Sequence, residues 1–404
     1  MKTLSQQNFE KVMQGVLKPG RYIGNETGAK SIDASKIEDT SQEVFFALAF
    51  PDVYEVGMSN LGMQILYDVI NSTGFSIAQR VFSPWIDMEK NLRESGTLLF
   101  SLENRIFLNE FDIIGISAQH ELQYTNILNI IDLAGLNLRA SDRTSEDPII
   151  CCGGPSVINP LPLAPFFDFF VIGDGEEVII EILKKFREVK SMHNRKKEFL
   201  ERIEGLKGVF IPVNHKLISF NSDLNSGKIS DKKVEKAVFK DFAVSKIVTD
   251  PVIPNIRPVH DRFVCEIMRG CSRGCRFCQA GYFYRPIRMK DASIAASQSI
   301  EGIENTGYDE ISFLSLSSAD YKGLDSLIKK ILENKKEGKL SISLPSLRLD
   351  SFTLDIADLV QSGRKTGLTF APEAGSQVLR DAINKNLDSG GMIECMKMAF
   401  KKGW

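Results

Sequence analysis

Between residues 44 and 190, short apolar runs alternate with stretches in which apolar residues recur at helical spacing. The predicted buried strands are 44–50, 112–117, 148–154 and 169–176. The predicted helices are 60–71, 126–136 and 176–189. Strands that alternate with helices form a parallel sheet with helices on both faces, so the pattern predicts a doubly wound α/β fold.

Loops that are polar or contain glycine follow these predicted strands. In a parallel sheet, the loops at the carboxyl ends of the strands meet at one edge and form the ligand crevice. Glycine lets the backbone approach a ligand closely, although a glycine after a strand often serves only as a turn. His120 lies in one of these loops, but a lone histidine is usually not a ligand. The loops are 51–62, 117–123, 153–160 and 173–177.

A second α/β unit follows a proline-containing linker at 250–261. Its predicted strands are 262–268, 310–318, 339–347 and 366–375, and its predicted helices are 291–305, 323–336 and 351–362. Apolar residues between Leu4 and Val16 recur at helical spacing and predict an N-terminal amphipathic helix. The expected domains are a helical extension (1–43), a Rossmann-type domain (44–190), a connecting segment with short strands (191–260) and the second unit (261–404).

Composition narrows the class of protein. With 404 residues and 43% hydrophobic residues, the chain can build ordinary cores in two or three domains. Its formal net charge of −2 gives no global indication of nucleic-acid binding. No apolar run approaches the roughly 20 residues of a membrane span, and the N-terminus lacks the layout of a secretion signal. We therefore expect a cytoplasmic protein that does not enter a membrane, with reduced cysteines.

The chemistry is concentrated in the stretch CEIMRGCSRGCRFCQAGYFYRP, residues 265–286. Cys271, Cys275 and Cys278 follow a predicted strand within one short loop, and three thiolates so close together indicate a metal centre. Structural zinc commonly uses two distant CxxC pairs, and no second pair exists here. Cys265 alternates with apolar residues on one face of its strand and is expected in the core. An iron–sulfur cluster is favoured, and zinc is the alternative.

The C-x3-C-x2-C spacing, with Phe277 before the last cysteine, resembles that of radical S-adenosylmethionine (radical SAM) enzymes. The resemblance implies a partial β/α barrel and a 4Fe–4S cluster held by the three cysteines, whose open iron binds SAM. In this family, one-electron reduction cleaves SAM to methionine and a 5′-deoxyadenosyl radical, which abstracts hydrogen from substrate. Arg285 and Arg288 follow the loop and are expected to cover the cluster or contact an anionic substrate.

The resemblance also suggests residues that bind SAM. The stretch SLSSAD stands where the family has a glycine-rich turn for the SAM amino group, and it lacks the glycines. Ser317, Ser318 and Asp320 are therefore candidates. Arg348 could meet the SAM carboxylate, with a surface salt bridge as the alternative. Glu373 stands where relatives place a polar group near the ribose, although an acid at a helix start needs no ligand.

The first domain resembles the cobalamin-binding domain found in many radical SAM enzymes. There, a D-x-H-x-x-G motif follows the first strand, and its histidine ligates cobalt. Here Tyr54 replaces the histidine and Gly57 completes the motif, while Ser117 and the pair Gly153 and Gly154 follow later strands. Either cobalamin binds without a lower protein ligand, or the domain has lost this cofactor.

Together with KPGRYIGNE (18–26), the two halves resemble radical SAM proteins that carry an N-terminal cobalamin-binding-like domain. Such barrels normally have six strands, and only four are visible before the sequence stops. We therefore expect a chain truncated within the barrel, or one completed by a separate C-terminal partner module. The resemblance also implies an electron donor such as flavodoxin or ferredoxin.

The expected function is a radical SAM enzyme that transfers a methyl or methylthio group to RNA or another large substrate. The N-terminal half lacks the three spaced cysteines of a second cluster, which argues against methylthio transfer. The alternative is a non-catalytic iron–sulfur or cobalamin-binding module.

Overall fold

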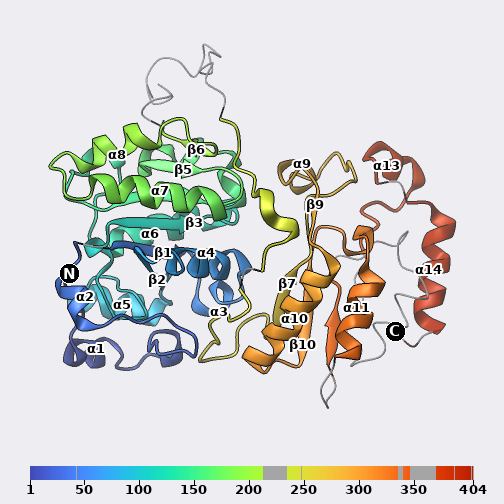
Figure 1. The fold of residues 1–404 in the computed structure, drawn as a ribbon, viewed down its shortest axis with the longest axis horizontal. Helices are drawn as coiled ribbons and strands as arrows, with labels where there is room; N and C mark the ends of the chain where they lie inside the picture. The colour runs from blue at the N-terminus through green and yellow to red at the C-terminus, as the bar shows by residue number, and fades with distance from the viewer. Residues whose placement is uncertain are drawn as a thin grey trace, which may run out of the picture. The chain divides into compact units, whose positions relative to one another are not determined.

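The computed structural model of the chain divides into two compact units (Figure 1). The first comprises Met1–Phe239 and Val252–Val259, and the second comprises Lys240–Pro251 and His260–Trp404. The predicted extension and most of the predicted connecting segment thus belong to the first unit. The structure describes residues 1–41, 43–212, 234–246, 248–334, 340–345, 370–385, 387–401 and 403.

A six-stranded sheet forms the centre of the first unit. Its strands are β1 (Val44–Phe50), β2 (Ser76–Phe82), β3 (Ile113–Ser117), β4 (Ile149–Gly153), β5 (Phe169–Val171) and β6 (Val209–Phe210). Their order is β2-β1-β3-β4-β5-β6, and all neighbours are parallel except β5 and β6. The first five strands have the flavodoxin-like order 2-1-3-4-5, in which ligands bind at the carboxyl ends of β1 and β3.

Helices cover both faces of this sheet. Because successive strand residues point to opposite faces, Phe45 of β1 packs in one core and Phe46 packs in the other. Helices α1 (Gln6–Val12), α5 (Ile86–Ser95) and α6 (Tyr124–Leu133) pack on the first face. Helices α4 (Leu61–Asn71), α7 (Glu176–Val189) and α8 (Arg195–Ile203) pack on the second, and α2 (Ala34–Glu38) and α3 (Tyr54–Gly57) are short. The predicted doubly wound fold is confirmed.

Strand β2 and helix α5 were not predicted from the sequence. Gln79 and Arg80 interrupt the apolar run of β2, yet both side chains are buried. Ser101 donates a hydrogen bond to the Gln79 side chain, and Arg80 pairs with Glu26 and Glu103. These partners come from other segments, so no local pattern marks the strand.

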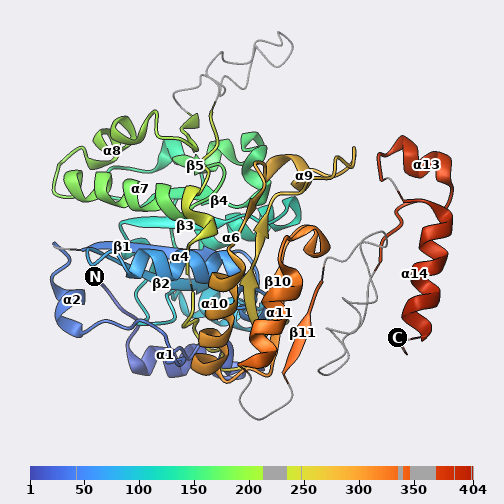
Figure 2. The same ribbon diagram turned by 45° about the vertical axis from the view of Figure 1, so that its right-hand side comes forward.

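The second unit contains the cysteine loop. In the part of this unit that the structure describes, three parallel strands form a sheet in the order β11-β10-β7, and α10 and α11 pack together against it (Figure 2). These elements are β7 (Phe263–Glu266), β10 (Glu310–Leu314), β11 (Ser341–Ser343), α10 (Ala292–Thr306) and α11 (Leu324–Glu333). The remaining elements are β8 (Met268–Arg269), β9 (Arg288–Met289), α9 (Ala280–Phe283), α13 (Gln377–Ala382) and α14 (Ser389–Lys401).

The fourth predicted strand of this unit is wrong where it can be checked. Residues 370–375 are not in a strand, and Glu373 has a positive φ of 68°. The carbonyls of Ala374 and Gly375 accept hydrogen bonds from Arg380, so the backbone turns here. The rest of that prediction (366–369) and the predicted helix 351–362 lie outside the described residues. Within the described part of the chain, no helix has the length and apolar character needed to cross a membrane.

Candidate functional site

The cysteine loop emerges at the carboxyl end of the sheet in the second unit. Strands β8 and β9 form an antiparallel ladder that holds the two ends of the loop together. Gly270 begins the loop with φ 82°, and a Cβ there would lie 2.8 Å from the Tyr284 carbonyl oxygen. Glycine is therefore required where the chain leaves β8.

The seven cysteines fall into two groups by exposure. Cys271, Cys275 and Cys278 are half-buried and unpaired, whereas the other four are buried. Cys265 is fully buried in the core, as its alternation predicts, and burial raises the pKa of its thiol to about 11. The remaining buried cysteines are Cys151, Cys152 and Cys395. The three thiols that solvent can reach are therefore those of the predicted cluster motif.

The donor set of the loop fits an iron–sulfur cluster or a zinc ion. The backbone N–H of Gly281 donates to the Sγ of Cys278 at 3.3 Å, and such hydrogen bonds stabilise a thiolate and tune a cluster. Phe277 is 54% exposed beside the last cysteine. In the described part of the chain, no three Cys, His, Asp or Glu side chains already converge on one metal position. The fit of the loop to a metal centre therefore rests on the chemical type of the three cysteines and on their partial exposure.

The loop after β10 contacts the cysteine loop directly. Arg273 donates to both carboxylate oxygens of Asp320, at 3.0 and 2.5 Å, and Ser317 donates to the same carboxylate at 2.8 Å. The structure thus brings Asp320 and Ser317 beside the cysteines, with the carboxylate already engaged by Arg273. Ser318 is fully buried and its hydroxyl pairs with that of Ser315 at 2.8 Å, so this hydroxyl is already engaged within the protein.

The structure describes some, but not all, of the other residues predicted to bind SAM. Glu373 is exposed, and its carboxylate pairs with Lys385 at 3.2 Å. Arg348 lies outside the described residues. Arg285 is exposed, its guanidinium lies over the Tyr282 ring at 4.9 Å, and it donates to the carbonyl of Arg273 in the cysteine loop. Arg285 therefore contacts the loop, and its role toward a cluster or an anionic substrate stays a prediction.

In the first unit, Tyr54 does not face the crevice. It is 1% exposed, and its hydroxyl donates to the Glu26 carboxylate at 3.1 Å and accepts the Asn255 backbone N–H at 2.9 Å. Burial, followed by the charge of Glu26, raises the pKa of the phenol. Tyr54 is therefore a structural residue that ties two distant segments to the start of α3.

The carboxyl ends of β3 and β4 are more open. Ser117 and Gly153 are half-buried there, and the Ser117 hydroxyl accepts a hydrogen bond from Gln119 at 2.6 Å. Gly154 has φ 102°, and a Cβ there would lie 2.5 Å from the Ala118 carbonyl oxygen, so glycine lets the two loops meet. Three large apolar side chains are exposed in these loops: Leu122, Ile158 and Leu161.

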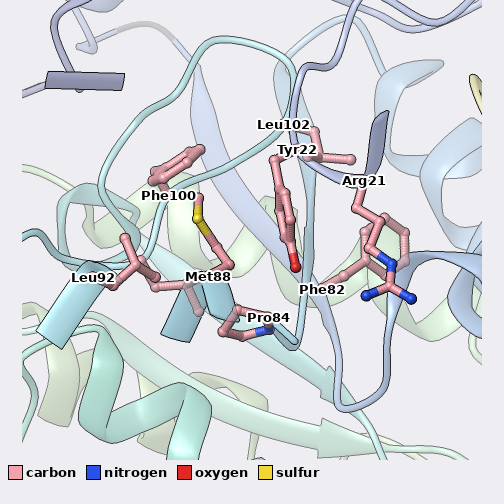
Figure 3. A pocket seen from close by; sticks show the side chains of 9 residues that line it. Arg21, Tyr22, Phe82, Pro84, Met88, Leu92, Phe100 and Leu102 are labelled. Carbon is pink, nitrogen blue, oxygen red and sulfur yellow. The ribbon is translucent and has the colours of Figure 1, made fainter. Parts of the chain in front are cut away.

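One cavity of the first unit lies between the N-terminal segment and the sheet (Figure 3). Its volume of about 10 Å³ is on the order of a single water. Arg21 and Tyr22 contribute the polar part of its wall, and the other lining residues are apolar. The cavity is a packing defect and is too small for a cofactor.

Several residues of the site were missed by sequence reasoning. Arg273 and Arg276 lie between the cysteines, and their positions inside the motif were a usable signal. Asn384 donates to the Gly274 carbonyl from 110 positions away, and nothing in the sequence connects the two residues.

Comparisons with known proteins agree with this arrangement. Residues 62–212 match the family model of radical SAM proteins, N-terminal, and residues 265–404 match that of the radical SAM superfamily. An uncharacterized protein of Methanocaldococcus jannaschii is 26% identical over 360 residues, which cover 88% of this chain and 66% of the relative.

The fold is similar to that of the radical SAM methyltransferase TsrM from Kitasatospora setae. The TsrM structure with tryptophan substrate and a SAM analog gives a TM-score of 0.60 at 12% identity, covering 89% of this chain and 66% of TsrM. The structure with cobalamin and a [4Fe–4S] cluster gives 0.56 at 12% identity, covering 89% and 65%. The chain thus spans just under two thirds of the length of these proteins.

The two family models follow one another along the chain and together cover most of it. The second begins at Cys265 and contains the whole cysteine motif. The resemblance predicted from the cysteine spacing is therefore confirmed, and the protein belongs to the radical SAM superfamily.

Proposed function

We propose that this protein is a radical SAM enzyme in which Cys271, Cys275 and Cys278 hold a 4Fe–4S cluster. The observation that carries the proposal is that these three cysteines are partly exposed on one loop whereas the other four cysteines are buried. When bound, the cluster supplies the electron that cleaves SAM reductively. An electron donor such as flavodoxin or ferredoxin then reduces the cluster again.

The residues of the chain bind and orient the cofactors in this proposal. Asp320 and Ser317 lie beside the cysteine loop, at the carboxyl end of β10, where parallel sheets bind ligands. Asp320 is engaged by Arg273, so it would reach the SAM amino group only by sharing its carboxylate. Glu373 and Arg348 stay in the proposal as SAM-binding residues on the strength of the resemblance.

We propose methyl transfer as the reaction class. Support comes from the fold shared with TsrM, a methyltransferase, and from the absence of the cysteines that methylthio transfer needs in the N-terminal half. That the methyl acceptor is RNA or another large molecule stays a prediction. So does the involvement of a separate C-terminal partner module. The tryptophan bound to TsrM is a substrate of that protein.

We further propose that the first unit binds cobalamin at the carboxyl ends of β3 and β4, beside Ser117, Gly153 and Gly154. The flavodoxin-like strand order and the half-open, glycine-containing edge support this placement. Both hydrogen-bonding capacities of the Tyr54 hydroxyl are used within the protein. Tyr54 is therefore not available as a ligand, and no protein side chain at that position would coordinate cobalt.

Anaerobic reconstitution with iron and sulfide tests the cluster. The protein should bind about four irons and absorb near 400 nm, and Ala at any one of the three motif cysteines should lower the iron content. Cys265→Ala is the matched control, because its thiol is fully buried, and it should retain iron. A colourless protein that binds zinc, or iron content unaffected by Cys271→Ala, would refute the assignment.

Activity and cobalamin are tested separately. With dithionite as the electron source, the reconstituted protein should cleave SAM to methionine and 5′-deoxyadenosine, and neither product should form with Cys275→Ala. Electron paramagnetic resonance of the reduced cobalamin complex should show no nitrogen hyperfine splitting from a protein imidazole. Such splitting would refute the proposed coordination.

A further inference from the structure

The cysteine loop makes a second set of contacts, with a segment more than 100 residues away. The backbone N–H of Arg276 donates to the Ile383 carbonyl at 3.0 Å, and the Arg276 side chain donates to the Ala382 carbonyl. The Asn384 side chain donates to the Gly274 carbonyl at 2.8 Å. Residues 274 and 276 flank Cys275, so these hydrogen bonds fix the backbone on both sides of the middle cysteine.

Two backbone features match this contact. Asn384 has a positive φ of 56°, a conformation that asparagine tolerates better than most residues. A Cβ at Gly274 would lie 3.1 Å from the Asn384 side-chain nitrogen, closer than ordinary contact. A small residue at 274 and an asparagine at 384 are thus both suited to this close approach.

Arg380 holds the distant segment in shape. Its side chain is buried, and it makes five hydrogen bonds, which matches the five N–H donors of a guanidinium. The acceptors are the carbonyls of Ala374, Gly375 and Leu387 and the side chains of Gln377 and Ser389, at 2.5 to 2.9 Å. A single buried cation thereby connects residues 374–385 with residues 387–389.

We propose that residues 374–385 and 387–389 form a clamp that holds the cysteine loop in its cluster-binding shape, with Asn384 and Arg380 as positioning residues. The proposal rests on the function proposed above. A metal site needs ligands held close to their bound geometry, and hydrogen bonds around the ligands supply that order. Arg273 and Asp320 hold the other side of the loop, so the cysteines lie between two independent anchors.

Asn384→Ala tests the clamp by removing the side-chain donor. Because alanine at a positive φ adds backbone strain of its own, Asn384→Gly, which accepts that φ, is measured beside it and should give the same result. The matched control is Asn305→Ala, in the same unit, whose side chain also donates to a backbone carbonyl, that of Thr249, at 2.9 Å. Arg380→Lys is a further variant. It keeps the charge but cannot supply five directed donors.

Hydrogen–deuterium exchange of the metal-free protein is the first measurement. The Arg276 amide should exchange about fivefold faster in Asn384→Ala than in the unaltered protein, the effect of losing about one hydrogen bond. Arg380→Lys should give a larger increase, and Asn305→Ala should give none. Equal exchange in the unaltered protein and in all of its variants would refute the clamp.

Iron loss from the reconstituted proteins to a chelator is the second measurement. Asn384→Ala should lose iron about fivefold faster than the unaltered protein, whereas Asn305→Ala should match it. Unchanged iron retention in all of the clamp variants would refute the positioning role. If the unaltered protein bound no iron, the proposed function would fail, and the exchange of the Arg276 amide would still decide whether the clamp exists.

Discussion

Replacement of Arg80 by methionine should destabilise the first unit more than any surface change. The guanidinium donates to Glu103 at 2.6 Å and to Glu26 at 2.9 Å. The three side chains are only 4%, 0% and 0% exposed for Arg80, Glu26 and Glu103. Burial opposes the charge on Arg80, but the two carboxylates outweigh it and raise its pKa.

The expected loss in the free energy of unfolding follows from the buried groups that the substitution leaves unpaired. Two buried carboxylates lose their cation, and breaking a buried ion pair in this way costs about 3–5 kcal/mol. Glu26 also accepts the Tyr54 hydroxyl, so the loss extends to the segment around Asn255. With a slope of about 3 kcal/mol/M, the urea midpoint should fall by about 1 M or more.

The assay can be confined to the first unit. The chain has two tryptophans, Trp85 and Trp404, so Trp404→Phe leaves the fluorescence of Trp85 as a probe of that unit. Arg93→Met is the matched control, because Arg93 also pairs with two carboxylates, at 3.0 and 2.9 Å, but its side chain is 46% exposed. It should cost about 0–1 kcal/mol. Equal midpoints for the two variants would show that the reasoning about burial is wrong.

Three further predictions concern thiols, pH and the cysteine loop. In the metal-free native protein at pH 8, a thiol reagent should label three cysteines rapidly and the buried four only on unfolding; rapid labelling of Cys265 would contradict its assignment to the core. Burial opposes ionisation of Glu55, but hydrogen bonds from Arg21 and Lys18 outweigh it and lower its pKa. Glu55→Gln should therefore reduce stability at neutral pH, and its difference from the unaltered protein should vanish as pH falls through the lowered pKa; a difference independent of pH would refute this. A double-mutant cycle of Arg273→Ala and Asp320→Ala should give a coupling of about 1 kcal/mol in the stability of the second unit, since both side chains are partly exposed, and additive effects would contradict the pairing.

The parts of the fold that depend on local pattern could be predicted from the sequence. Strands β1, β3 and β4 are continuous apolar runs buried on both faces, which is typical of a parallel sheet. Helix α7 has the predicted bounds, because its apolar residues keep helical spacing throughout. The cysteine motif was equally readable, because its three ligands lie within one loop and are defined by spacing alone.

The burial and the contacts of polar side chains, in contrast, became known only from the folded chain. Strand β2 escaped prediction because Arg80 finds its partners at residues 26 and 103. Tyr54 aligns with a cofactor ligand in sequence, yet its contacts with Glu26 and Asn255 make it structural.

The same reason separates the proposed cluster ligands from the residues that contact their loop. Cys271, Cys275 and Cys278 are neighbours along the chain, whereas Asp320 and Asn384 reach the loop across 47 and 110 positions. A hydrogen bond depends on distance and direction within a few tenths of an ångström, and folding alone brings such distant groups together. The proposed ligands can therefore be identified from local sequence, whereas the contacts of their loop depend on the folded second unit.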